Sequence, residues 1–332
     1  MPSPDDPQPA SHGVWHAGAP ARPFRPIPTP SVRPWAGTRL GLHGLSVGEL
    51  WLAGPASRVP GAVDGEATLD ELAARHGAAL VGGRGMALLG PRFPLLVKLI
   101  DAADRLSLQV HPDDALAREL YGPDALGKAE AWLILDAAPG ATLVTGPGAG
   151  LDAETVRDVV VRGVMDLEHC ATSEARAGDT LLLRPGTIHA IGAGTFVYEI
   201  EQPSDLTFRI SDWGRPTGRT LHLAEALRAV DPVAHAVPVG RGWALDDGRL
   251  EVPEFRLELV AGSKVAASDR WARTPAGRTV EVVTALRGTV VARGEGWEER
   301  LAPWETLVVP AAIDAYELAP GPDALVAVGS IP

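Results

Sequence analysis

Short apolar runs separated by turn-forming residues make up most of the chain after residue 34. Several of these runs are continuous rather than alternating, which is typical of strands that are covered on both faces. They predict β-strands at residues 94–102, 107–111, 131–137, 180–185, 195–201, 255–260, 279–286 and 306–310. The pattern therefore predicts a mainly β protein.

Helical patterns are few and short. Thr68 and Glu71 have the spacing of a capping box, in which two side chains three residues apart cap the start of a helix. Apolar residues recur with helical spacing at 113–121, 152–162 and 222–230. Many strands with a few short helices predict a sandwich or jelly-roll architecture.

Two segments resemble each other, which indicates an internal repeat. In residues 178–191 and again in residues 303–316, an apolar strand runs into a proline, and a polar side chain follows an isoleucine four residues later. The first segment has His189 at that position and the second has Asp314. We therefore expect two related β-barrels.

Composition narrows the class of protein. The 332 residues carry a formal net charge of −12, which argues against a broad surface for nucleic acid or an anionic membrane. The single cysteine, Cys170, excludes an intramolecular disulfide framework and a multi-cysteine metal site. No apolar run approaches the roughly 18 residues that span a bilayer, and the acidic, proline-rich start does not resemble a secretory signal. We expect a cytoplasmic protein with no nucleic-acid or membrane partner.

Three short motifs at strand ends contain candidate metal ligands. The period of two in a strand places Gln109 and His111 on one face, and Pro112 ends that strand. Glu130 directly precedes a predicted strand, and His189 follows another. Each of these residues by itself is more often structural than functional. Together, two imidazoles, a carboxylate and an amide oxygen form a mixed site that suits Zn²⁺, with Fe²⁺, Mn²⁺ or Co²⁺ as alternatives.

Lysine is rare in this chain. Arginine accounts for 27 of the 30 basic residues, and the lysines are Lys98, Lys128 and Lys264. Unlike arginine, lysine can lose its proton in a protein. Lys128 lies two residues before Glu130, so on an extended chain the two side chains share a face. We expect an amine beside a metal cation to have a lowered pKa, which suits proton transfer or polarisation of a hydroxyl group.

Four segments taken together resemble the type I mannose-6-phosphate isomerases (phosphomannose isomerases) of the cupin superfamily, in their short bacterial branch. The segments are LSLQVHPDD (106–114), GKAEAW (127–132), GTIHAIGAG (186–194) and EIEQPSDLTFRISDWGR (199–215). Their order and spacing match that family, and the resemblance extends over roughly 34–232. It implies a mainly β fold of two cupin-type jelly-roll barrels with a few short helices.

The resemblance also implies a metal and a reaction. One zinc ion per chain would be held by Gln109, His111, Glu130 and His189, with other divalent metals possible. The enzyme would interconvert D-mannose 6-phosphate and D-fructose 6-phosphate in carbohydrate metabolism, through a cis-enediolate that the metal stabilises as a Lewis acid. The ligand would be a small sugar phosphate, and both a monomer and a homodimer remain open.

The same resemblance suggests which residues act on the substrate. Glu199 and Lys128 are the candidate proton carriers. We favour Glu199, because a carboxylate near a metal cation is ionised at neutral pH whereas Lys128 must first lose its proton. Arg209 cannot act as a base, so it would stabilise negative charge or contact the phosphate. Further candidates for binding the phosphate are Ser107, Lys98 and Arg215.

The chain is expected to have three parts. Ten of the 30 prolines lie within the first 34 residues, so we expect residues 1–26 to be a proline-rich mobile extension. Residues 27–232 would form a catalytic metal-binding cupin domain with helical insertions. Residues 233–332 would form a cupin-like barrel without metal, because Asp314 stands where His189 stands in the first repeat.

Two other functions are compatible with these motifs. One is a non-catalytic cupin that binds sugar phosphates, and the other is a metal-dependent cupin enzyme of different chemistry, such as a dioxygenase. Gln109 in place of a histidine, together with Lys128 and Arg209, favours a phosphorylated sugar over dioxygen chemistry. A pure binding protein needs no proton carrier, so Glu199 counts against the first alternative.

Overall fold

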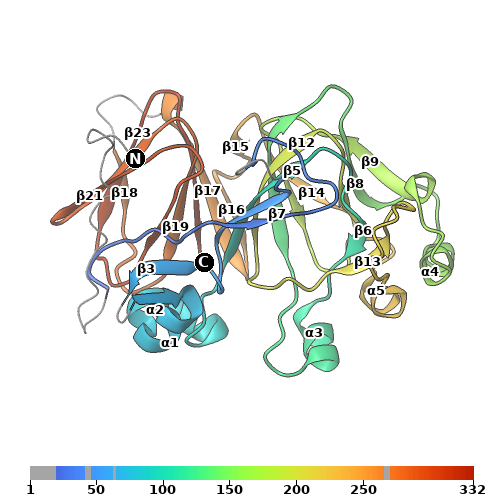
Figure 1. Cartoon of the computed structure of the whole chain (residues 1–332), viewed down its shortest axis with the longest axis horizontal. Coiled ribbons are helices and arrows are strands. Elements are labelled where there is room, and N and C mark those ends of the chain that lie inside the picture. The colour runs from blue at the N-terminus through green and yellow to red at the C-terminus, as the bar shows by residue number, and fades with distance from the viewer. Residues whose placement is uncertain (1–19, 42–45, 63–64, 265–269) are drawn as a thin grey trace, which may run out of the picture.

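A computed structural model describes residues 20–41, 46–62, 65–264 and 270–332. The described chain is mainly β with five α-helices, and its strands gather into two halves that lie side by side (Figure 1). Residues 1–19, which include most of the proline-rich extension expected at 1–26, lie outside the described residues. No helix among the described residues has the length and apolar character needed to cross a membrane.

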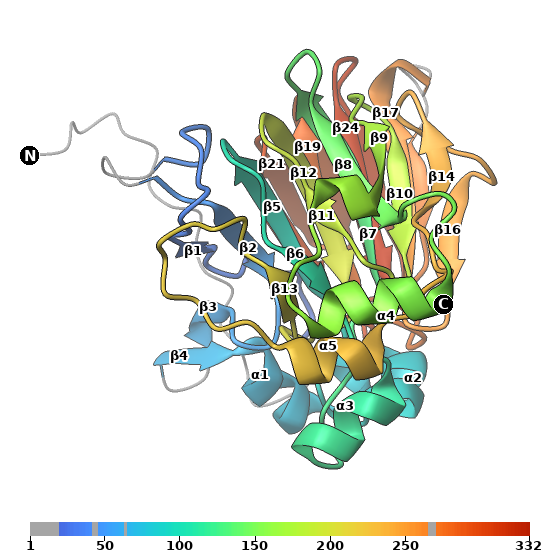
Figure 2. The ribbon, with the colours of Figure 1, turned by 90° about the vertical axis from the view of Figure 1, so that its right-hand side faces the viewer.

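The first half is built around an eight-stranded antiparallel sheet in the order β1-β2-β5-β12-β7-β10-β14-β15. Two smaller sheets, β11-β8-β9 and β13-β6, belong to the same half (Figure 2). Apolar side chains of β5, β7 and β12 share one buried cluster with side chains of β8 and β11, so the large sheet packs against a smaller one. The strands of this half are β1 (Thr29–Ser31), β2 (Glu49–Ala53), β5 (Leu96–Ala102), β6 (Leu108–Val110), β7 (Glu130–Ala137), β8 (Thr142–Pro147), β9 (Cys170–Glu174), β10 (Thr180–Leu183), β11 (Ala190–Ile191), β12 (Thr195–Glu201), β13 (Phe208–Ser211), β14 (Val237–Arg241) and β15 (Ala244–Leu245).

The second half consists of two sheets, in the orders β16-β17-β24-β19-β22 and β18-β23-β20-β21. A buried cluster of valines, leucines and alanines from both sheets fills the space between them. The strands are β16 (Arg249–Val252), β17 (Phe255–Ala261), β18 (Trp271–Arg273), β19 (Glu281–Arg287), β20 (Val290–Gly294), β21 (Trp297–Leu301), β22 (Thr306–Val309), β23 (Tyr316–Pro320) and β24 (Leu325–Ser330). A separate hairpin pairs β3 (Arg58–Ala62) with β4 (Gly65–Thr68).

The helices are short, and most start at a side-chain cap. Thr68, Asp113 and Asp152 each accept a hydrogen bond from a backbone N–H in the first turn, which compensates for the missing intrahelical partner. The helices are α1 (Leu69–His76), α2 (Ala78–Leu89), α3 (Asp114–Tyr121), α4 (Ala153–Val161) and α5 (Leu223–Ala229), with short 3-10 turns at Leu167–His169 and Gly262–Lys264.

All the strands and helices predicted from the pattern are confirmed within two residues at their ends, but many of the shorter strands and the helix α2 were not predicted. Its sequence contains Gly82, Gly83 and Gly85, which weaken a helical pattern. The helix is kinked at Gly82, where φ is +79°. A Cβ atom there would lie 2.4 Å from the Arg278 backbone, so this glycine lets α2 contact the second half closely.

A single buried core joins the two halves. Tyr198 and Ile200 of β12 belong to the same apolar cluster as Val282, Val308 and Ala327 of the second half. Because side chains alternate along a strand, the neighbouring Glu199 and Glu201 point to the opposite face of the large sheet. The second half therefore packs behind the strand that presents these carboxylates.

The segment after residue 20 crosses from one half to the other. Phe24 pairs with Val308 of β22, and Ile27 pairs with Arg58 of β3. The chain then forms β1 at the edge of the large sheet. Trp35 follows, and its side chain is buried in the first half.

We expect Gly82→Ala to lower the free energy of unfolding by about 1–3 kcal/mol, because alanine is strained at this backbone conformation and its Cβ atom meets Arg278. The matched control is Gly83→Ala, whose Cβ atom would come no closer than 3.7 Å to a neighbour. Denaturant unfolding measures both. Equal stability of the two variants would contradict the proposed contact.

Candidate metal centre and adjoining cavity

The four predicted metal ligands come together between the large sheet and the smaller sheets that face it. Glu130 is the first residue of β7 in the large sheet. Gln109 lies in β6, His111 follows that strand, and His189 directly precedes β11. The backbones of Gln109 and His189 exchange two hydrogen bonds, of 3.0 and 2.9 Å, which hold these two residues side by side.

Both imidazoles are oriented by backbone carbonyl groups. Nδ1 of His111 lies 2.7 Å from the carbonyl oxygen of Leu206, and Nδ1 of His189 lies 2.8 Å from that of Thr187. A carbonyl oxygen only accepts hydrogen bonds, so each Nδ1 carries the proton and each Nε2 is unprotonated, with its lone pair available as an acceptor. The two Nε2 atoms lie 3.4 and 3.3 Å from the carboxylate oxygens of Glu130. Metal-ligating histidines are oriented in this way.

The side chains at this position fit a divalent cation. Glu130 is fully buried, and its Oε1 has no hydrogen-bond partner among the described residues. The two unprotonated Nε2 atoms and the carboxylate of Glu130 cannot form hydrogen bonds with one another, because nitrogen lone pairs and carboxylate oxygens all act as acceptors. Burial lowers the pKa of His189 to about 3, so its ring is neutral, as a metal ligand must be. His111, Glu130 and His189 could therefore hold a metal ion.

Gln109, the fourth expected metal ligand, lies next to His189. Its Nε2 lies 3.2 Å from Nε2 of His189, and its Oε1 accepts a hydrogen bond of 3.2 Å from Ser107. A half-turn of the amide brings Oε1 to the place that Nε2 occupies, next to the two imidazoles.

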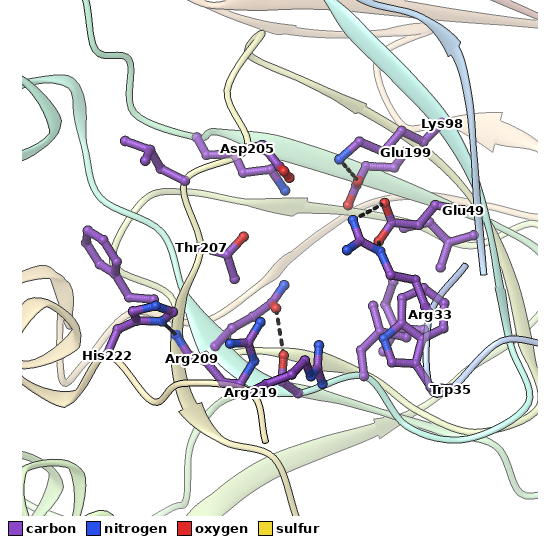
Figure 3. Close-up of a pocket in the computed structure, with 18 of the residues that line it drawn as sticks. Arg33, Trp35, Glu49, Lys98, Glu199, Asp205, Thr207, Arg209, Arg219 and His222 are labelled. Atoms are coloured by element: carbon purple, nitrogen blue, oxygen red, sulfur yellow. Dashed lines mark hydrogen bonds and ion pairs between the residues drawn. The ribbon is translucent and has the colours of Figure 1, made fainter. Parts of the chain in front are cut away.

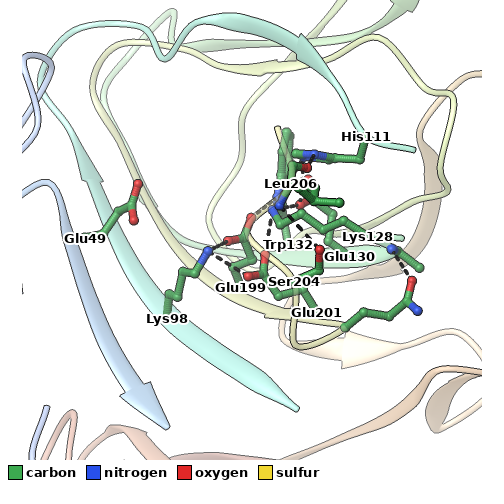
Figure 4. Close-up of polar contacts among 12 residues, drawn as sticks. Glu49, Lys98, His111, Lys128, Glu130, Trp132, Glu199, Glu201, Ser204 and Leu206 are labelled. Atoms are coloured by element: carbon green, nitrogen blue, oxygen red, sulfur yellow. Dashed lines mark hydrogen bonds and ion pairs between the residues drawn. The ribbon is translucent and has the colours of Figure 1, made fainter. Parts of the chain in front are cut away.

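A row of buried charges continues from Glu130 across the large sheet (Figure 4). The amine of Lys128 lies 2.5 Å from Glu130 Oε2 and 2.7 Å from Glu201 Oε2. The amine of Lys98 lies 2.7 Å from Glu201 Oε1 and 3.4 Å from Glu199 Oε2. Each of these five side chains is at most 5% exposed, so the charges compensate one another with almost no help from water.

The protein's own side chains shift the pKa of Lys128 upward, whereas the lowering expected from the sequence depends on a metal cation beside the amine. Burial lowers the pKa of the amine, but the carboxylates of Glu130 and Glu199 outweigh burial and raise it well above the ordinary value. Lys98 behaves in the same way, with Glu201 as the main partner. In turn, burial raises the pKa of Glu130, whereas the Lys128 amine brings it well below the ordinary value. Burial and the nearby Glu199 raise the pKa of Glu201, an effect that the two amines oppose.

A cavity of about 340 Å³ opens beside this row (Figure 3). Glu199 lies on its wall, where the indole N–H of Trp132 donates a hydrogen bond of 2.9 Å to Oε1. The other charged side chains of the wall are Arg33, Glu49, Lys98, Lys128, Asp205, Arg209 and Arg219. The cavity therefore offers a held carboxylate together with several cationic groups.

Comparison with known proteins supports the resemblance noted in the sequence. Residues 43–130 match the family described as phosphomannose isomerase type I, catalytic domain. A mannose-6-phosphate isomerase of Streptococcus mutans is 36% identical over 208 residues, which are 58% of this chain and 63% of that protein. The mannose-6-phosphate isomerase ManA of Bacillus subtilis is 33% identical over 231 residues, which are 64% of this chain and 70% of that protein.

This chain belongs to the type I phosphomannose isomerase family. The fold agrees with solved members: the mannose 6-phosphate isomerase of Bacillus subtilis superposes with a TM-score of 0.75 over 92% of this chain and 99% of its own, at 24% identity. A putative mannosephosphate isomerase of Archaeoglobus fulgidus superposes with a TM-score of 0.73 over 94% of this chain and 98% of its own, at 22% identity.

The structure brings most of the site residues expected of a phosphomannose isomerase to one place. Ser107, Lys98 and Arg209 all line the cavity, with Lys128 and Glu199. Arg215 does not line it: this side chain pairs with Asp104 and Asp212 and borders a different hollow.

Sequence reasoning missed Glu201 and, on the cavity wall, Arg33, Glu49 and Arg219. Glu201 follows Glu199 by two positions, so the alternation of a strand could have placed both on the same face. Arg219 lies outside every motif and reaches the cavity through the loop before α5, where it pairs with Asp212. Its place depends on the path of that loop, which no local pattern indicates.

We expect His111→Ala and His189→Ala each to weaken zinc binding by more than about 100-fold, because even loss of an outer partner of a metal ligand costs 10–100-fold. Equilibrium dialysis with metal analysis measures the affinity. The control is His222→Ala, since His222 lies on the cavity wall outside the ligand group and accepts a hydrogen bond from the Arg209 N–H. Wild-type zinc affinity in either of the first two variants would contradict the assigned metal centre.

Proposed function

We propose that this protein is an aldose–ketose isomerase that interconverts D-mannose 6-phosphate and D-fructose 6-phosphate. The observation that carries the proposal is a held carboxylate, Glu199, on the wall of a cationic cavity beside a group of side chains that fits a divalent metal. Membership of the phosphomannose isomerase family supports the choice of substrate.

The reaction moves one proton between C2 and C1 of the open-chain sugar through a cis-enediolate. A carbon acid next to a carbonyl is weak, so the site must stabilise the negative charge on O1 and O2 by several kcal/mol. A zinc ion, one per chain, held by Gln109, His111, Glu130 and His189 would supply Lewis-acid stabilisation next to the cavity.

Glu199 is the proton carrier in this proposal. Trp132 and Lys98 contact its two oxygens, so the carboxylate is held in one orientation on the cavity wall. Lys128 keeps its proton, because the neighbouring carboxylates raise its pKa. A protonated amine cannot accept a proton, so Lys128 donates a hydrogen bond to a substrate oxygen instead.

Arg209 and Arg219 bind the phosphate in this proposal. Both side chains line the cavity, and Arg209 Nε is buried without a hydrogen-bond partner among the described residues. Burial and then the charge of Arg219 lower the pKa of Arg209, which is the effect expected where two guanidinium groups lie close together. A dianionic phosphate would relieve this repulsion.

We also propose that each half is a cupin-type jelly roll and that only the first half binds a catalytic metal. The paired sheets of each half support the first point, since a jelly roll consists of two facing sheets. Asp314, in the position that corresponds to His189, is exposed. We propose that the boundary between the two halves follows β15 rather than residue 232, because β14 and β15 extend the sheet of the first half.

The test of the activity is a coupled isomerase assay on metal-stripped protein before and after zinc is restored. Turnover of mannose 6-phosphate that returns with zinc supports the proposal. Tight binding of the sugar phosphate without turnover would instead indicate a binding protein. Oxygen uptake with iron, in place of isomerisation, would indicate a different enzyme of the cupin superfamily.

We expect Glu199→Gln to keep zinc and substrate binding but to lower kcat by about 10²–10⁴-fold, because the variant loses the proton carrier. Lys128→Met should impair both kcat and KM, because it loses a hydrogen bond to the substrate. Exchange of the C2 hydrogen with solvent gives a second measurement. Exchange that persists in Glu199→Gln and disappears in Lys128→Met would assign the proton transfer to Lys128.

We expect Arg219→Met to raise KM for mannose 6-phosphate by about 10–100-fold, because a hydrogen bond to a charged group contributes 1.5–3 kcal/mol. Arg215→Met also removes an arginine that pairs with Asp212, but this side chain lies outside the cavity. Steady-state kinetics of both variants decide between the two arginines, and a larger increase in KM for Arg215→Met would contradict the assignment.

A further inference from the structure

Glu201 is a fully buried carboxylate that lies outside the group of His111, Glu130 and His189 and does not line the cavity, although its oxygens lie within 4.8 Å of those of Glu130 and Glu199. It lies on the same face of β12 as Glu199. Each of its two oxygens lies 2.7 Å from a different amine: Oε1 from Lys98 and Oε2 from Lys128 (Figure 4). One side chain therefore contacts both lysines of the cavity.

Each of these amines also reaches a second carboxylate. Lys128 lies 2.5 Å from Oε2 of Glu130, beside the metal-ligand group. Lys98 lies 3.4 Å from Oε2 of Glu199, the proton carrier of the proposed reaction. Glu201 thus connects the amine next to the metal ligands with the amine next to the proton carrier.

The strand that carries Glu201 is held on both sides, whereas the lysine side chains are flexible. In β12, Glu199 pairs with Lys98 of β5, and Glu201 pairs with Glu130 of β7. A lysine side chain has about 2 kcal/mol of rotamer entropy to lose when it is fixed. The ammonium groups of Lys98 and Lys128 also repel each other. Without the Glu201 carboxylate between them, we expect the two groups to move apart.

We propose that Glu201 is a positioning residue that holds the Lys128 amine against Glu130 and the Lys98 amine against Glu199. Its effect on turnover rests on the proposed isomerase function, whereas the two contacts themselves do not. Because both amines line the cavity, their position determines where a bound substrate meets its hydrogen-bond donors.

The contacts can be tested directly, because the chain has only three lysines. Protein labelled with ¹³C at lysine Cε gives three NMR signals, and Lys264→Arg identifies the third. We expect Glu201→Gln to shift the signals of Lys98 and Lys128 and to leave that of Lys264 unchanged. The matched control is Glu281→Gln, which alters a buried carboxylate of the second half that pairs with Arg273 and should shift none of the three. An unchanged signal from either cavity lysine in Glu201→Gln would overturn the proposal.

Glu201→Asp separates position from charge. Aspartate keeps the charge, but it is shorter by one methylene group and cannot reach both amines. We expect kcat to fall by about 10–100-fold in both Glu201→Gln and Glu201→Asp, with zinc content unchanged and KM altered only a few-fold. Wild-type kcat in Glu201→Asp would show that charge alone is sufficient, and the positioning role would be wrong.

If the Glu201 variants do not fold, single lysine variants in the protein with Glu201 intact test the same contact. Lys98→Met should shift the signal of Lys128, and Lys128→Met should shift that of Lys98, because the two amines share the Glu201 carboxylate. Absence of both shifts would overturn the proposal. If the wild-type protein shows no isomerase activity, the proposed function fails, while the lysine spectra still decide whether Glu201 holds both amines.

Discussion

The burial of several carboxylates between two sheets is the constraint on which this site depends. Glu130, Glu199 and Glu201 approach within 4.8 Å of one another and are almost entirely shielded from solvent. An unpaired buried charge costs several kcal/mol, so the interior must supply cations. Lys98 and Lys128 supply two of them. The unpaired oxygen of Glu130 and the unprotonated Nε2 atoms of the histidines indicate where a divalent cation fits.

The second half of the protein meets a similar constraint in a different way. Its buried Glu281 pairs with Arg273, and the hydroxyl group of Tyr316 donates a further hydrogen bond of 2.6 Å to the same carboxylate. Arg273 also pairs with Glu258. This network is satisfied by the protein's own side chains, in contrast to Glu130. The same architecture thus contains one polar core that is complete and one that is open to a ligand.

The strand β12 explains why the two halves are packed together. One of its faces presents Glu199 and Glu201 to the site, and the other packs Tyr198 and Ile200 against the second half. A strand that carries two buried carboxylates is stabilised by apolar burial on its other face. The second half therefore supports the site through this core, and none of its described residues lines the cavity.

The sequence by itself predicted the mainly β class, the longer buried strands and the capped helices, and its short motifs singled out His111, Glu130 and His189, which the fold brings together. It also indicated the face on which Lys128 lies. It could not predict α2, where the need for glycine at position 82 comes from close contact with the Arg278 backbone.

Only the tertiary structure decided which carboxylates surround Lys128 and which of Arg215 and Arg219 lines the cavity. The pKa of a buried amine depends on the charges that distant strands bring near it, and here β7 and β12 bring three carboxylates. The position of an arginine on a loop depends on the path of the whole segment. Both features depend on contacts between residues far apart in the chain, so a local sequence pattern cannot predict them.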